Sequence, residues 1–94
     1  MYFLAICLEF ELIEVIGTLA KYRFGYCLRE LDGVIELDLP KLISGETPKD
    51  TPINEVVKLI NNIQTQQNAY RVFSKIYKHY LEYNDYPLKG GYYA

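Results

Sequence analysis

The chain has 94 residues and a net charge of −2, with 50% hydrophobic and 23% charged residues. A chain of this length forms one domain, 1–94, whose thin core hides roughly 60 to 70% of the surface exposed on unfolding. The composition excludes a mainly disordered chain, and the mild net charge gives no global reason to expect nucleic-acid or membrane binding.

The first twenty residues are apolar, but neither a signal peptide nor a membrane-spanning helix fits them. Glu9, Glu11 and Glu14 interrupt the run, and no basic residue precedes it. We therefore expect a cytoplasmic protein. Residues 2–9 are rich in strand formers and predict a central strand, whereas the spacing over 11–21 predicts an amphipathic helix, weakened by Gly17.

Cys7 and Cys27 have no CxxC spacing and no histidine or cysteine neighbour at the spacing of metal ligands. We expect small buried residues on strands, in a reducing compartment. A disulfide between them stays open as an alternative.

The segment 23–40 predicts a hairpin around Asp32-Gly33, a pair that suits a two-residue type I′ turn. In that register Arg29 pairs with Glu36 across the strands. Pro40 then ends the second strand. The predicted buried face consists of Phe24, Tyr26, Leu28, Ile35, Leu37 and Leu39.

Residues 41–51 read as a loop, and Thr51-Pro52 predicts the start of a helical region over 52–84. The apolar stripe changes direction near 64–68, which favours two helices over one long helix. The tail 85–94 is aromatic. The sequence thus predicts an α+β fold in the order β-α-β-β-α-α, with helices on one face of a small, mainly antiparallel, three-stranded sheet.

No pattern indicates catalysis, a cofactor or a metal. His79 is the only histidine and has no ligand-type residue one turn away, and Glu36, Asp38 and Lys41 do not match the order of a nuclease site. Glycine-rich phosphate loops and a serine nucleophile motif are not found in the sequence. We expect a protein that is not an enzyme.

Seven of the ten tyrosines lie after residue 69, interleaved with basic residues, and residues 56–81 contain no acid. On a helical wheel from Ala69 to Asn84 the two sets separate into an apolar arc and a basic face. The partner-binding residues we predict are Tyr83, Tyr86, Tyr92 and Tyr93. The basic face consists of Arg71, Lys75 and Lys78.

The arc is wider than one-sided packing needs, and tyrosine is favoured at interfaces. We therefore expect a small interaction or regulatory protein that self-associates and binds a partner protein through its C-terminal helix and tail. The bias toward Ile, Lys, Asn and Tyr is compatible with an AT-rich genome, including a phage or mobile element. One alternative is a nucleic-acid-binding module that uses Arg71, Lys75 and Lys78. Another is a small-ligand sensor with a pocket between sheet and helices.

Overall fold

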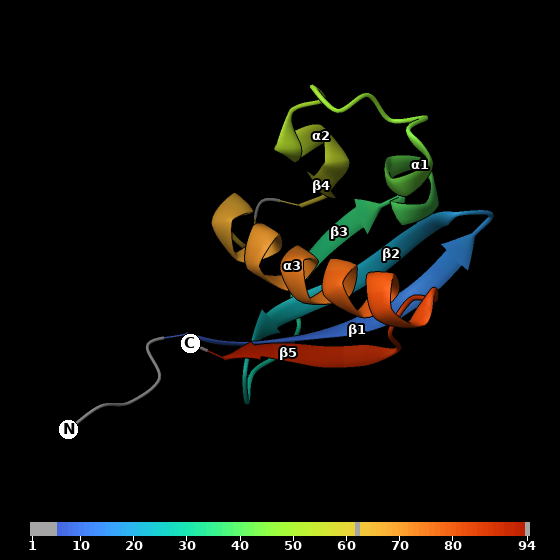
Figure 1. Ribbon diagram of the computed structural model, residues 1–94. Coiled ribbons are helices and arrows are strands. Elements are labelled where there is room, and N and C mark those ends of the chain that lie inside the picture. Colours follow the sequence, from blue (N-terminus) through green and yellow to red (C-terminus); the bar gives the residue numbers. More distant parts are fainter. Residues whose placement is uncertain (1–5, 62, 94) are drawn as a thin grey trace.

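The computed structural model describes residues 6–61 and 63–93, and these residues form an α+β fold (Figure 1). Five strands make one antiparallel sheet of order β4-β3-β2-β1-β5. The predicted class is confirmed, but the sheet has five strands where we expected three. The elements are β1 (Cys7–Ile16), β2 (Leu19–Tyr26), β3 (Gly33–Leu37), α1 (Leu39–Ser44), α2 (Ile53–Val56), β4 (Val57–Leu59), α3 (Gln66–Tyr83) and β5 (Lys89–Tyr93).

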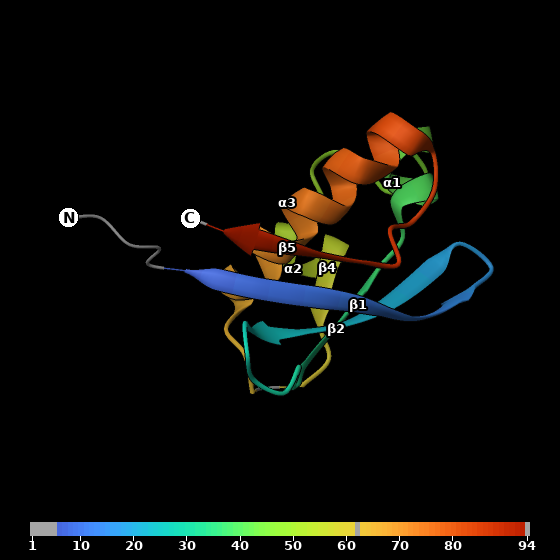
Figure 2. The ribbon, with the colours of Figure 1, turned by 90° about the horizontal axis from the view of Figure 1, so that it is seen from below.

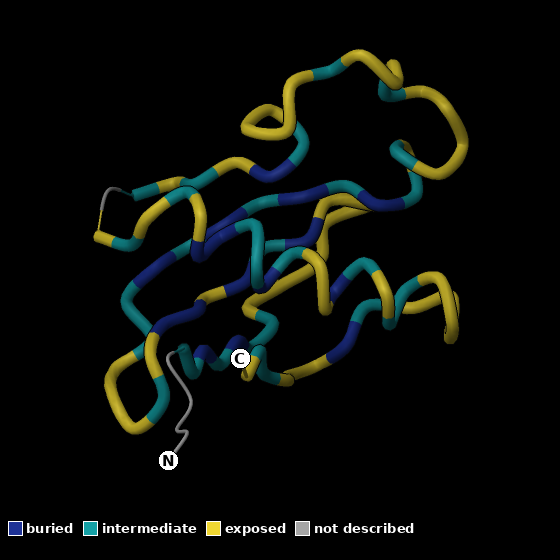
Figure 3. Tube along the Cα trace, turned by 60° about the vertical axis from the view of Figure 1, so that its left-hand side comes forward, coloured by how far each residue is buried: buried dark blue, intermediate teal, exposed yellow. Residues whose placement is uncertain are grey.

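The helices gather on one side of the sheet, and α3 crosses it between the two edge strands (Figure 2). Alternate residues of the inner strands point toward α3 and are buried, as a half-covered antiparallel sheet requires. Figure 3 shows the burial along the strands and the exposed segment between α1 and α2. The core consists of Leu8, Phe10, Ala20, Tyr22, Phe24, Ile35, Leu37, Leu39, Val57, Ala69, Val72 and Ile76.

The helix predicted over 11–21 is wrong, because this segment forms the second half of β1, a tight turn and the start of β2. Gly17 lies in that turn with φ of +62°, a conformation that glycine adopts freely. A bulge between Leu12 and Glu14 shifts the register of β1 against β2. The extra residue breaks the two-residue alternation, so the sequence spacing resembles that of a helix. Residues 2–5 of the predicted first strand lie outside the described residues.

The predicted hairpin turn at Asp32-Gly33 is also wrong. Gly33 lies within the sheet opposite Phe24, and residues 27–32 form the connection instead. A Cβ on Gly33 would approach the Phe24 ring within 2.6 Å, so glycine is needed there for close packing and not for a turn.

The new register changes the partners that we predicted on both faces. Glu36 lies opposite Lys21 and Lys58, so the expected Arg29 pair is not formed. Leu28, expected in the core, is 100% exposed. Four of the six residues of the predicted buried face are in the core, namely Phe24, Ile35, Leu37 and Leu39.

The helix predicted from Pro52 is reduced to the four residues of α2, after which the chain enters β4. Lys58 is exposed between buried Val57 and half-buried Leu59, a two-residue period typical of a strand, and the strand order places β4 at the edge of the sheet. The stretch 41–51 is not entirely loop, because α1 extends from Leu39 to Ser44, with Asp38 accepting a hydrogen bond from the Lys41 amide. The long helix α3 begins at Gln66, within the interval 64–68.

Half of the aromatic tail 85–94 is part of the sheet. Its residues from Lys89 to Tyr93 pair with β1 as the strand β5, and residue 94 lies outside the described residues. No described helix is long and apolar enough to cross a membrane.

Cys7 and Cys27 are joined by a disulfide, with their Cα atoms 5.4 Å apart. The expectation of reduced cysteines is therefore wrong, and the alternative of a disulfide between them is the one that the structure shows. Disulfides persist mainly in oxidising environments, so the pair weighs against the cytoplasmic location, which stays a prediction.

Candidate partner-binding surface

The apolar arc of α3 is divided between the sheet and a side groove. Ala69, Val72 and Ile76 are fully buried against the sheet. Phe73 and Tyr77 lie on the flank next to them and stack, with ring centroids 5.6 Å apart and an interplanar angle of 10°. The apolar arc is wide because one part of it packs on the sheet and another part lines the side groove.

The groove beside that flank has a volume of about 480 Å³ and lies between α3 and the segment that contains α1 and α2. Its lining is mainly apolar and includes Ile43, Ile53, Phe73, Tyr77 and Leu81, with Lys49 as its one charged residue. The groove can accept aliphatic side chains, but its single charged residue defines no partner chemistry.

Tyr86, which we predicted to contact a partner, is half-buried inside the fold. Its hydroxyl accepts a hydrogen bond from the Leu39 amide at 2.9 Å and donates one to the Thr18 carbonyl at 2.7 Å. Burial raises the pKa of Tyr86 to about 12. Burial also raises the pKa of Tyr22, whose hydroxyl donates to the Pro87 carbonyl. Tyr86 therefore connects parts of the fold.

The other three predicted tyrosines lie at the surface to different degrees. Tyr83 is 61% exposed, and its ring centroid lies 4.6 Å from that of His79, which pairs with Asp85. Tyr93 is 56% exposed on the open face of the sheet, and Tyr92 is half-buried on the α3 side. Tyr83 is on the helix, whereas the other two belong to the edge strand.

The predicted basic residues lie on the surface of α3, and Lys75 reaches the edge strand. Its Nζ lies 5.8 Å from the centroid of the Tyr92 ring, a cation–π contact. Arg71 donates to the Asn68 side-chain oxygen at 2.8 Å, and Lys78 is exposed. Within the described ranges none of the three basic residues forms an ion pair. Their charge is thus available to an anionic partner.

A buried polar network anchors the start of α3, and sequence reasoning missed it. Asn68 is only 2% exposed, and its amide donates to the Tyr26 hydroxyl at 2.9 Å and to Gln64 at 3.3 Å. Gln64 in turn donates to the Asp32 carboxylate at 2.8 Å. Because each buried group has a partner, the network fixes α3, and with it Arg71, relative to the 27–32 connection.

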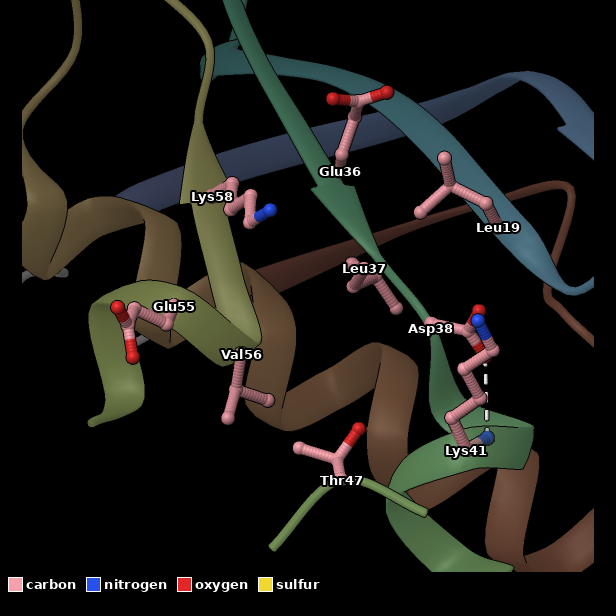
Figure 4. Close-up of a pocket in the computed structure, with 9 residues that line it drawn as sticks. All are labelled: Leu19, Glu36, Leu37, Asp38, Lys41, Thr47, Glu55, Val56 and Lys58. Carbon is pink, nitrogen blue, oxygen red and sulfur yellow. Dashed lines mark hydrogen bonds between the residues drawn. The ribbon is translucent and has the colours of Figure 1, made fainter. Parts of the chain in front are cut away.

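A polar pocket of about 250 Å³ lies at the ends of β3 and β4, beside α1 (Figure 4). Its charged lining contains Glu36, Asp38, Lys41, Glu55 and Lys58. Asp38 already accepts hydrogen bonds from the Thr18 hydroxyl and the Lys41 amide. The charges nearly balance, so the pocket selects neither anions nor cations. The small-ligand alternative stays a prediction without a ligand class.

The described residues contain no group of three histidine, cysteine or acidic side chains placed to hold a metal ion. The surface of α3 and β5 carries positive charge without an ion-pair partner among the described residues, two exposed aromatic rings and a sheet edge. It belongs to an α+β protein with a half-covered antiparallel sheet. No family model, curated protein or solved structure matches the chain.

Proposed function

We propose that the chain is a small non-enzymatic interaction protein that binds an acidic partner protein through α3 and β5. The observation that carries the proposal is the contact of Lys75 with Tyr92, which places the basic face of the helix beside the edge strand. Positive charge without internal partners favours an anionic surface and speeds its association. Aromatic side chains at the same place add contact area.

Charge also bears on the expected self-association. Two copies meeting at this edge would bring their basic helix faces toward one another, and like charges across an interface are unfavourable. The proposed partner at this surface is therefore an acidic chain and not a second copy.

A binding titration of the isotopically labelled protein with a short poly-glutamate peptide at low salt tests the proposal. We expect amide shifts concentrated in α3 and β5. The variants Lys75→Glu and Lys78→Glu are expected to abolish binding, whereas Lys49→Glu, which makes the same charge change in an exposed loop, leaves it intact. Absence of binding at low salt, or equal loss in the loop variant, would contradict the proposal.

A nucleic-acid-binding function is the second candidate, favoured by the same combination of a tyrosine ring and three basic side chains on one helix. Titrating the protein with short single-stranded and double-stranded DNA, under the same conditions as the peptide, distinguishes a nucleic-acid partner from an acidic protein. Phosphate binding weakens steeply with salt because each neutralised phosphate releases counterions. Tight, salt-sensitive DNA binding without peptide binding would favour nucleic acid as the partner.

A further inference from the structure

Two backbone hydrogen bonds determine which residues of β5 pair with β1 and which face outward. The Leu12 amide donates to the Leu88 carbonyl at 2.8 Å, and the Cys27 amide donates to the Cys7 carbonyl at 2.9 Å. In an antiparallel ladder the residues of one strand bond alternately to the left and to the right. From Cys7 to Leu12, before the bulge, even-numbered residues of β1 therefore bond to β5, and odd-numbered residues bond to β2.

The same alternation gives the direction of each peptide group in β5. Gly90 and Tyr92 lie opposite Phe10 and Leu8, so their amides and carbonyls face β1. Lys89, Gly91 and Tyr93 then direct theirs away from the sheet, on a side where no strand of residues 6–61 or 63–93 lies. Among these residues, β5 thus presents a row of unpaired donors and acceptors.

The opposite edge of the sheet is less available. β4 has only three residues, and the Val57 carbonyl that faces outward accepts a hydrogen bond from the Gln66 side chain at 3.1 Å. A side chain thus occupies one of the few outward-facing groups of this edge. β5 has no comparable contact among the described hydrogen bonds, and Gly91 at its centre carries no side chain that could obstruct a neighbour.

Charge then selects what can lie along β5. Lys75 lies above the strand on the helix side, and Lys89, which lies opposite Glu11 of β1, is exposed at its start. An extended segment with acidic side chains would satisfy the backbone groups and the positive charge of Lys75 on the helix side, whereas a basic or neutral strand would satisfy the backbone alone.

From these contacts, the geometry points to strand addition: β5 takes an extended acidic segment of the partner protein as a sixth strand of the sheet. The inference rests on the proposed function and names its binding mode. Lys89, Gly91 and Tyr93 supply the main-chain hydrogen bonds, and Lys75 supplies selectivity for acids.

Amide hydrogen exchange in the presence of a peptide of alternating threonine and glutamate tests this mode. Exchange at Lys89, Gly91 and Tyr93 is expected to slow, whereas Gly90 and Tyr92, already bonded to β1, should change little. Unchanged exchange at the three outward amides, with the peptide bound, would overturn strand addition and leave the proposed function intact.

Two substitutions at one position provide a matched comparison. Gly91→Pro removes an amide that faces away from β1, a position where an edge strand tolerates proline. Gly91→Ala keeps the amide, and its Cβ would collide with the hydroxyl and two ring carbons of Tyr93, an exposed side chain that must turn aside, as it must for the proline ring. We expect about tenfold weaker peptide binding for the proline variant and at most about twofold for alanine. Equal affinities would contradict the mode.

Three further outcomes separate the possibilities. Binding of poly-glutamate that Lys75→Glu abolishes but Gly91→Pro does not would support the acidic partner and refute strand addition. Failure of both peptides to bind at low salt would refute the proposed function and this inference together. A dimer detected by light scattering that Gly91→Pro dissociates would identify a second copy as the occupant and overturn the acidic segment.

Discussion

Tyr86 shows how one side chain can connect segments that are distant in sequence. The Leu39 amide is the first of α1, so it has no acceptor within its helix, and the Tyr86 hydroxyl supplies one. The same hydroxyl donates to Thr18 in the β1–β2 turn. A tyrosine that sequence reasoning assigned to a partner therefore satisfies two backbone groups of its own chain.

Replacing this hydroxyl is expected to destabilise the fold. Tyr86→Phe leaves the amide of buried Leu39 without an acceptor, which costs about 1 to 3 kcal/mol of unfolding free energy. Urea unfolding measures the loss. Tyr83→Phe is the control, because that side chain is exposed, and its effect should stay below about 0.5 kcal/mol. Equal effects of the two substitutions would refute the structural role of Tyr86.

The same residue predicts how stability responds to alkaline pH. The pKa of folded Tyr86 is about 12, above its ordinary value of 10.0, so the unfolded chain loses this proton first. The stabilisation is complete below pH 10 and is lost as pH rises through 10 toward about 12. Urea midpoints across this range, with tyrosinate absorbance, should fall less steeply in Tyr86→Phe than in the original chain. Parallel curves would contradict the assignment.

Among the elements, those with one exposed and one buried face were the most predictable. α3 was recognisable because its apolar and basic sides separate at the helical period, and β3 because the buried residues Gly33, Ile35 and Leu37 alternate with half-buried neighbours. The β1–β2 hairpin was not recognisable, since its bulge disrupts the alternation. β5 was not predicted either, because Gly90 and Gly91 have low strand propensity and form a strand only by pairing with β1, which is distant in sequence.

The open face of the sheet carries alternating charges that fix its register. Glu11, Glu14 and Glu36 each lie opposite a base of a neighbouring strand, and such cross-strand pairs contribute about 0.2 to 1 kcal/mol each; Glu9, opposite Gly25 and Gly91, is the exception. The first row is Glu14, Lys21, Glu36 and Lys58, and the second is Lys89, Glu11 and Arg23. Only the pair of Arg23 and Glu11 is in direct contact. The rows explain why charges fill a face that the helices leave uncovered.

Reversing one charge in the first row should therefore weaken the sheet. Glu36→Lys places three lysines in line across β2, β3 and β4, and we expect about 1 kcal/mol of destabilisation at low salt. High salt should reduce the effect because exposed charges are screened. Glu46→Lys makes the same change in an exposed loop and is the control. Urea midpoints of both variants, measured at two salt concentrations, test this prediction. An equal loss of stability in Glu36→Lys and Glu46→Lys would contradict a stabilising role of the charge rows.

For the molecule as a whole, the residues of the proposed binding surface were predictable, apart from Tyr86, but their arrangement was not. The basic face of α3 and the exposed tyrosines followed from spacing. Their junction did not, because Lys75 meets Tyr92 only after the chain crosses the sheet through α3 and returns along β1 as β5. The free edge of β5 depends on the same long-range pairing, which periodicity cannot reveal.

The disulfide also acts at the scale of the molecule, since a core this small gains much from a covalent link. Cys7 and Cys27 are 20 residues apart, and the bond closes the β1–β2 hairpin at the centre of the sheet. A link across a loop of this size restricts the unfolded chain and contributes about 3 kcal/mol. Reduction should lower the urea midpoint accordingly and expose more β5 amides to exchange, because β5 pairs only with β1. The double variant Cys7→Ser with Cys27→Ser should have the urea midpoint of the reduced protein, and adding reductant should not change it. If reduction of the original chain leaves its urea midpoint unchanged, the stability of the sheet does not depend on this disulfide.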